Sequence, residues 1–145
     1  PEVTEFMVWP RLTREDEVRE FLARRERDWA SGSEYMWAIT EPGVDVVIGG
    51  ISGRPRTSDA DFGYVFDRRY WNRGLATEAA AAVTSWLFSR PGVRRVWATC
   101  DVENARSIRV LEKLGLAREG LVPGGVVRPN LSSQPRDTYL YGRGA

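Results

Sequence analysis

The sequence predicts an α/β (α+β) domain that contains a pair of parallel strands. Residues 60–115 read as strand, helix, strand and helix, and two strands joined by a helix run parallel with a right-handed crossover. The two strand-like runs before this unit are joined by a turn, which predicts a hairpin. With 145 residues, the chain fits one domain, residues 1–145.

The first half of the chain predicts one helix and a hairpin. Residues 14–29 form an amphipathic helix with Thr13 as the expected N-cap and with an apolar stripe at helical spacing, Val18, Phe21, Leu22 and Trp29. Two strands follow over residues 35–40 and 44–52, joined by a turn at Glu41-Pro42-Gly43. Residues 53–59 read as a loop, and residues 60–66 as the next strand.

The second half predicts two helices and three strands. A helix follows Gly74 and ends before Pro91-Gly92, a strand covers residues 93–101, and a helix over residues 104–115 ends at Gly115 in a left-handed cap. Residues 116–127 and 137–143 read as strands separated by a loop over residues 128–136.

Composition excludes several classes of site. The chain has no histidine, so Ser-His-Asp and Cys-His hydrolases and histidine-containing zinc sites are excluded. Its single cysteine, Cys100, can form no internal disulfide and reads as a small apolar residue on a buried strand. The formal net charge of +1 favours neither nucleic acid nor a membrane as partner, and with no apolar run of transmembrane length the cytoplasm is the expected compartment.

The turn before the first long interior helix predicts a phosphate site. Tyr70-Trp71-Asn72-Arg73-Gly74-Leu75-Ala76-Thr77 leads from a strand straight into a helix, whose first N–H groups have no intrahelical acceptor. Glycine lets the main chain approach a ligand closely, and the positive end of the helix dipole favours an anion. A mononucleotide site fits less well, because no Lys-Ser or Lys-Thr pair follows the glycine.

A second helix start carries two polar side chains on one face. Asn104 and Ser107 lie three residues apart, so both can face the same ligand. Asparagine and serine are also ordinary helix caps, and taken alone the pair favours that interpretation. Only in combination with the glycine turn, the intervening helix and strand, and Glu112-Lys113-Leu114-Gly115-Leu116 does the pattern over residues 60–118 become specific.

These segments resemble the RimJ/RimL-like branch of the GNAT superfamily of N-acetyltransferases. The resemblance rests on Asp61-Phe62-Gly63-Tyr64, on residues 70–79, and on residues 104–115. It implies a GNAT-like fold of three layers, in which a mixed, mostly antiparallel sheet has a splayed parallel central strand pair and carries helices on both faces. It also implies acetyl-CoA as cosubstrate without a metal ion, and an amine acceptor that is a protein N-terminus or a small molecule. Transfer would proceed by direct attack of the amine in a ternary complex, and a homodimer is one arrangement open to the protein. A non-catalytic acyl-CoA-binding module is the alternative.

The resemblance also implies roles for individual residues. The N–H groups of Arg73, Gly74, Leu75 and Ala76 would meet the pyrophosphate, and Thr77 would add a hydroxyl. The edge formed by Tyr64, Val65 and Phe66 would pair with the pantetheine amides. Asn104 would bind pantetheine, and Ser107 would bind the cofactor and protonate the departing thiolate, although many superfamily members use a tyrosine there. Trp71 stands where the superfamily usually has Gln or Arg, which leaves Arg73 as the nearest phosphate-facing side chain.

Three questions stay open at the level of sequence. The base that takes the proton of the ammonium is Asp61, Asp101, Glu103, Glu34 or water. An aromatic acceptor pocket would use Trp9, Trp37 and Trp71, whereas Trp86 and Trp97 read as core. The resembling branch has a strand and a helix upstream of Pro1, so the resemblance implies that an opening strand is missing from residues 1–145.

Overall fold

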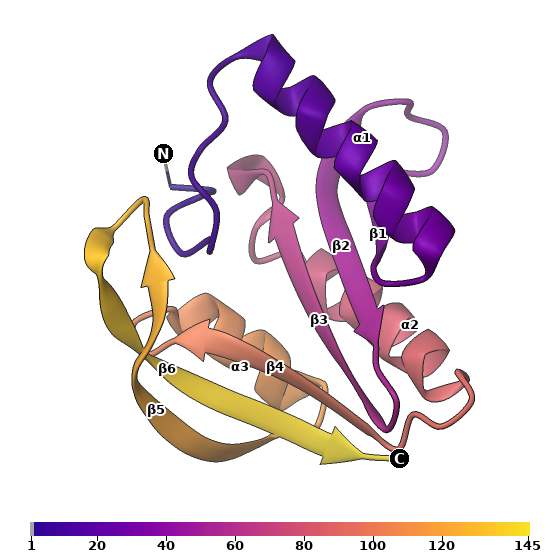
Figure 1. Cartoon of the computed structure of the whole chain (residues 1–145), viewed down its shortest axis with the longest axis vertical. Helices are drawn as coiled ribbons and strands as arrows, with labels where there is room; N and C mark the ends of the chain where they lie inside the picture. The colour runs from indigo at the N-terminus through magenta and orange to yellow at the C-terminus, as the bar shows by residue number, and fades with distance from the viewer. Residues whose placement is uncertain (1) are drawn as a thin grey trace.

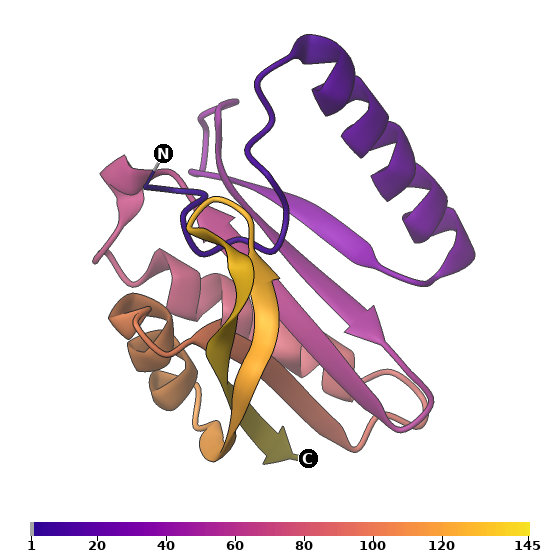
Figure 2. The same ribbon diagram turned by 60° about the vertical axis from the view of Figure 1, so that its left-hand side comes forward.

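A computed structural model describes residues 2–145 as a six-stranded sheet with helices on both faces (Figure 1). The elements in chain order are α1 (Glu15–Ser31), β1 (Tyr35–Thr40), β2 (Val47–Pro55), β3 (Asp59–Phe66), the short 3-10 helix η1 (Arg68–Tyr70), α2 (Leu75–Phe88), β4 (Arg95–Asp101), α3 (Ala105–Lys113), β5 (Ala117–Arg128) and β6 (Ser132–Gly144). The strand order is β1-β2-β3-β4-β6-β5, and every neighbouring pair except β3–β4 is antiparallel. Helices α2 and α3 cover one face and α1 lies on the other (Figure 2), so the predicted fold class is confirmed.

The hydrophobic core lies between the sheet and helices α2 and α3. Its buried side chains come from β2, β3, β4, β6 and both helices, and they include Ile51, Phe62, Val83, Leu87, Val96, Leu111 and Tyr141. Complete burial of one such leucine stabilises the fold by about 2 kcal/mol. Helix α1 has no buried residue, and Val18, Leu22 and Trp29 on its apolar stripe remain 40–54% exposed.

The parallel strands β3 and β4 are paired only at their beginnings. Asp59 pairs with Arg95, Ala60 with Val96 and Asp61 with Trp97, and no further pair follows. Beyond this point β3 stays on β2 and β4 stays on β6, so the two strands diverge (Figure 1). The register between β2 and β3 is continuous, so the divergence requires no bulge in β3.

Two predicted boundaries in the first half of the chain are wrong by a few residues. The N-cap of α1 is Arg14 rather than Thr13, because the carboxylate of Glu17 reaches back and accepts both the Thr13 N–H (2.9 Å) and the Arg14 N–H (3.1 Å). Strand β2 begins at Val47 and continues to Pro55, so the loop predicted over residues 53–59 shrinks to a tight turn. The Arg56 N–H donates to the Asp59 carbonyl at 2.8 Å and closes that turn.

The loop predicted over residues 128–136 is also wrong, since β6 begins at Ser132. Arg128 pairs with Ser132 and Val127 with Pro135, and shifts in register absorb the polar and proline residues. These residues read as a loop because polar side chains and proline are unfavourable inside a sheet, but they are tolerated on an irregular edge.

The segment before α1 lies between the end of β3 and the tip of the β5–β6 hairpin (Figures 1 and 2). Asn130 holds it there: the side-chain amide donates to the carbonyls of Thr4 (2.7 Å) and Trp9 (2.9 Å) and accepts the Arg11 N–H (2.9 Å). Arg128 Nη1 donates to the Phe6 carbonyl at 2.7 Å. These bonds place the segment next to the splayed strands.

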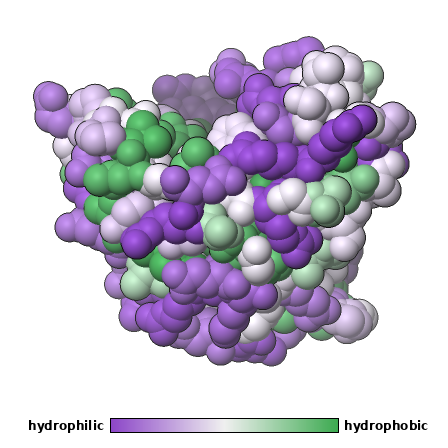
Figure 3. Space-filling view, turned by 90° about the horizontal axis from the view of Figure 1, so that it is seen from below, coloured by the Kyte–Doolittle hydropathy of each residue, from purple (hydrophilic) through white to green (hydrophobic). Residues whose placement is uncertain are grey.

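The surface mixes charged and apolar residues. Seen from below the view of Figure 1, hydrophilic residues cover most of the molecule and hydrophobic ones gather in separate patches (Figure 3). Exposed apolar side chains include Leu121, Val122 and Val127 on β5. Across residues 2–145, no helix combines the length and the hydrophobicity needed to span a lipid bilayer.

Candidate active site

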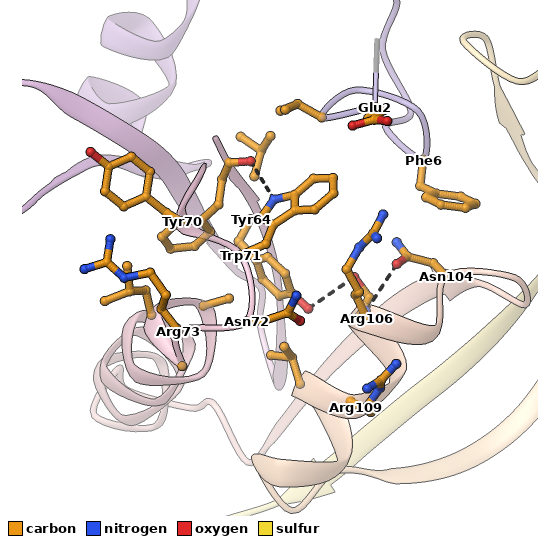
Figure 4. Close-up of a pocket in the computed structure, with 18 of the residues that line it drawn as sticks. Glu2, Phe6, Tyr64, Tyr70, Trp71, Asn72, Arg73, Asn104, Arg106 and Arg109 are labelled. Carbon is orange, nitrogen blue, oxygen red and sulfur yellow. Dashed lines mark hydrogen bonds between the residues drawn. The ribbon is translucent and has the colours of Figure 1, made fainter. Parts of the chain in front are cut away.

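A cavity of about 280 Å³ lies beside the end of β3, between the starts of α2 and α3 (Figure 4). It brings together most of the residues singled out from the sequence: Tyr64, Val65, Phe66, Arg73, Gly74, Leu75, Ala76, Asn104 and Ser107. Thr77 does not line it, although its hydroxyl was a predicted phosphate donor. No group of three His, Cys, Asp or Glu side chains within residues 2–145 could hold a metal ion.

The start of α2 presents unpaired N–H groups to this cavity. Gly74 is the N-cap with φ of +79°, and the first intrahelical bond is donated by Glu78 to the Gly74 carbonyl at 3.0 Å. The N–H groups of Leu75, Ala76 and Thr77 therefore have no intrahelical acceptor, and glycine has no side chain that could cap them. A Cβ on Gly74 would meet no protein atom within 4 Å, so the backbone angle demands glycine here and packing does not. This arrangement suits a phosphate group.

Cations from α3, rather than Arg73, flank the helix start. The Arg73 guanidinium donates to Glu41 at 2.9 Å and lies 5.1 Å from the Tyr70 ring, so its side chain is held by protein groups. Arg106 stacks on Trp71, with 4.0 Å between the guanidinium carbon and the ring centre. Sequence reasoning missed Arg106 together with two further cations of α3 that line the cavity, Arg109 and Lys113. Their spacing of three and four residues on one helix was the available signal.

Asn104 and Ser107 meet Tyr64 of β3 in this cavity. The Asn104 side-chain oxygen accepts the Ser107 N–H at 3.2 Å, so Asn104 is the N-cap of α3. This confirms the cap interpretation. The cap uses only the side-chain oxygen, so the NH₂ group of Asn104 can still donate to a ligand. The Tyr64 hydroxyl donates to Ser107 Oγ at 3.3 Å (Figure 4). Burial raises the pKa of Tyr64 to about 12, against a smaller lowering by the bond to Ser107, so the phenol stays protonated and leaves the serine proton free to be donated.

The predicted strand edge is partly occupied by the protein itself. The Trp71 indole N–H donates to the Phe66 carbonyl at 2.9 Å. The Val65 carbonyl points toward Gly49 of β2, within the continuous β2–β3 ladder, so Tyr64 is the residue of this edge whose main chain is better placed for a ligand amide. The same bond fixes Trp71 in the position where it stacks with Arg106.

A second cavity of about 400 Å³ lies on the opposite face of the sheet, next to α1. Tyr64, Asn104 and Ser107 line both cavities, so the two meet where β3 and β4 diverge. Trp9 and Trp97 line the second cavity. Trp37 instead packs against Trp29 (5.4 Å between ring centres) and Trp86 (5.0 Å), so the predictions for Trp37 and Trp97 are wrong.

Two of the proposed base candidates in the second cavity are bound by arginines. Glu34 pairs with Arg25 and with Arg54 (2.8 Å), and Asp61 pairs with Arg54 (2.5 Å) and Arg56 (3.0 Å). Burial acts to raise the pKa of Glu34, but the bond from Ser52 and the charges of Arg54 and Arg25 outweigh it and lower the pKa. At neutral pH Glu34 is thus a paired carboxylate and a weak base.

The other two candidates share Arg136. Asp101 is fully buried and accepts Arg136 Nε at 2.7 Å, while Arg128 Nε lies 3.3 Å from it. Burial acts to raise the pKa of Asp101, but Arg136, the Glu103 N–H and Arg128 together lower it. Glu103 pairs with Arg136, is exposed and lines neither cavity. Each of the four carboxylates is therefore held in an ion pair with at least one arginine.

Comparison with known proteins agrees with this geometry. The sequence profile of the acetyltransferase (GNAT) domain matches residues 1–117. An uncharacterized N-acetyltransferase of Bacillus subtilis, YnaD, is 43% identical over 81 residues, which are 56% of this chain and 46% of that protein. The probable N-acetyltransferase YjcK of the same species is 32% identical over 72% of this chain and 58% of its own length. This chain therefore spans only about half the length of these two relatives.

Solved structures share the fold over nearly the whole chain. A GNAT-family acetyltransferase from Bacillus anthracis has 26% identity and a TM-score of 0.82, covering 99% of this chain and 81% of that one. RimL, a ribosomal L7/L12 alpha-N-protein acetyltransferase, has 21% identity and a TM-score of 0.85, covering 98% of this chain and 76% of its own. On the profile match and the shared architecture, this chain belongs to the GNAT acetyltransferase family.

Proposed function

We propose that this protein binds acetyl-CoA and transfers its acetyl group to a primary amine, of a protein N-terminus or a small molecule, by direct attack in a ternary complex. One observation carries the proposal: the uncapped start of α2 and the Tyr64–Ser107 pair line the same cavity, which meets a second cavity at the splayed strands. A thioester held in the first cavity and an amine held in the second would come together at Ser107.

The first cavity fits a CoA thioester in three respects. The N–H groups at the start of α2 suit the pyrophosphate, and Arg106, Arg109 and Lys113 add positive charge beside it. The β3 edge at Tyr64 suits the amides of pantetheine, because β4 leaves that edge unpaired. The amide group of Asn104 can take part in the same contacts.

The chemistry needs orientation and proton transfer. The ammonium first loses a proton to water, because the four carboxylates are held in ion pairs. The amine nitrogen then bonds to the acetyl carbon, the carbon–sulfur bond breaks, and its electron pair stays on sulfur. Ser107 protonates the thiolate, and the amide nitrogen gives up its remaining extra proton to water. Ser107 regains a proton from solvent, while Tyr64 keeps it oriented.

The relatives support both classes of acceptor. The name of RimL gives the alpha-amino group of a protein as its acceptor. AaaT of Escherichia coli is named an L-amino acid N-acetyltransferase, and it is 33% identical over 61% of this chain. A module that binds acyl-CoA without transfer would have the same first cavity. The second cavity, which opens at Ser107, favours the enzyme.

Calorimetry with CoA and acetyl-CoA tests the cofactor site. Gly74→Val should weaken binding by about 10-fold or more, because its side chain would enter the cavity and strain the start of α2. Gly43→Val is the matched control: Gly43 also has a positive φ (+77°) and open space around it, but it lies in the β1–β2 turn. Equal CoA affinity in the Gly74→Val variant and the wild type would refute the site. Release of free thiol from acetyl-CoA with a panel of amines then separates a transferase from a binding module.

A further inference from the structure

Arg128, at the end of β5, is a buried arginine whose hydrogen-bonding capacity is not used up. Its side chain is only 5% exposed and lines the second cavity. Nη1 donates to the Phe6 carbonyl, but Nε and Nη2 have no hydrogen-bond partner within residues 2–145. Burying guanidinium donors without an acceptor is costly, so the site is built for an acceptor that the protein itself does not supply.

The neighbouring acid does not satisfy this arginine. Asp101 Oδ2 lies 3.3 Å from Arg128 Nε, without hydrogen-bond alignment. Both oxygens of Asp101 are already used, by Arg136 Nε (2.7 Å), by Arg136 Nη2 (3.1 Å) and by the Glu103 N–H (3.0 Å). Burial lowers the pKa of Arg128 by more than the neighbouring Asp101 raises it.

Most of the other charged residues of the second cavity are paired with one another, and Arg24, which also lines it, is exposed to solvent. Glu34 is held by Arg25 and Arg54, and Asp61 by Arg54 and Arg56. Arg25 uses its terminal nitrogens on Glu34 and Asp28. Arg128 thus retains an unbonded terminal nitrogen beside this cavity, and a negatively charged ligand is the group that it would attract.

We propose that the acceptor is a small amine that also carries a carboxylate, and that Arg128 binds this carboxylate while the amine faces Ser107. The inference rests on the proposed function. A guanidinium binds a carboxylate through directed N–H groups, and the bond is strong where water is excluded. The walls formed by Trp9, Phe21, Met36 and Trp97 suit the remainder of an amino acid. A protein N-terminus carries a neutral amide in place of that carboxylate, so its hydrogen bond to Arg128 would lack the charge of the acceptor and be weaker.

Binding of product analogues tests the inference without requiring turnover. The probes are the N-acetyl derivatives of glycine, methionine and phenylalanine, each as the free acid and as the carboxamide, titrated by calorimetry into the protein saturated with CoA. At least one acid should bind about 10-fold or more tightly than its amide, because the bond to Arg128 is charge-assisted. Arg128→Gln should abolish this preference, and Arg128→Lys should retain part of it, since lysine keeps the charge but loses the planar fork.

Arg136→Gln is the matched control, because Arg136 contacts the same Asp101 but does not line the second cavity. It should leave the preference for the acid intact. If no acid in the panel binds more tightly than its amide in the wild type, Arg128 does not recognise a carboxylate, whether or not the Gln variant folds. If Arg136→Gln abolishes the preference as Arg128→Gln does, the effect belongs to Asp101 and the inference also fails. Failure of the proposed function would instead appear as absent CoA binding, or as absent thiol release with every amine tested.

Discussion

Replacing Ser107 with alanine tests whether its hydroxyl is the proton donor for the departing thiolate. The bond from the Ser107 N–H to Asn104 uses the backbone, so it survives the substitution and the start of α3 stays capped. CoA affinity should therefore change little, while kcat should fall about 10²-fold, equivalent to about 2.7 kcal/mol of barrier. The substitution also removes the partner of the Tyr64 hydroxyl at 3.3 Å. Because that bond is long and lies at a cavity, the loss should lower the free energy of unfolding by only about 1 kcal/mol.

The assay combines thiol release at saturating acetyl-CoA with calorimetry for CoA and urea unfolding. Tyr64→Phe is the matched control, since it breaks the same hydrogen bond from the other side and keeps the serine hydroxyl. It should reduce kcat by less than 10-fold, because Ser107 loses orientation but keeps its proton. Unchanged kcat in Ser107→Ala would refute the proton-donor role and leave solvent as the acid. Equal losses in the two variants would assign the effect to the pair rather than to the serine proton.

Three further predictions concern groups around the site. Asn104→Ala should cost about 1 kcal/mol of stability and weaken CoA binding, whereas Asn104→Ser should keep the cap and weaken only CoA binding, as unfolding and calorimetry would show. Asp101→Asn should destabilise the protein by about 3 kcal/mol by leaving Arg136 and Arg128 unbalanced. Folding lowers the pKa of Asp101, so its contribution to the free energy of unfolding is present above the unfolded pKa of 3.8 and is lost as pH falls through the folded pKa. The free energy of unfolding of the Asn variant should therefore depend less steeply on pH in this acid range. Cys100 is only 4% exposed, and its burial raises the pKa of the thiol to about 11. A thiol reagent at pH 8 should therefore label Cys100 far more slowly in the folded protein than in the unfolded chain, and equal rates would contradict its burial.

Features that depend on neighbouring residues could be predicted from the sequence. Gly74 opens α2 with a positive φ, Asn104 caps α3, and Gly115 follows α3 with φ of +76°. Each follows from the conformational freedom of glycine or from the reach of a short side chain to the backbone nearby. The order of strands and helices between residues 60 and 115 followed from hydrophobic spacing in the same local way.

Features that depend on distant residues could not be predicted. Tyr64 and Ser107 are 43 positions apart, and Glu41 lies 32 positions before Arg73. The burial of Arg128 could not be predicted either, because the groups around it belong to Asp101 and Phe6, which are distant in the sequence. Strand β6 likewise extends through Ser132 and Pro135 only because β5 pairs with it there.

The short pairing of β3 with β4 has a consequence for cooperativity. The sheet consists of two units, β1-β2-β3 and β4-β6-β5, joined by three residue pairs and by α2, which packs on β2, β3 and β4. Amide hydrogen exchange should distinguish them, with fast exchange along the edges that face each other beyond Asp61 and Trp97. A ligand that hydrogen-bonds to both edges would replace the backbone hydrogen bonds that β3 and β4 do not make to each other there. It would couple the opening of one unit to that of the other, so that slowed exchange in both units would report its binding.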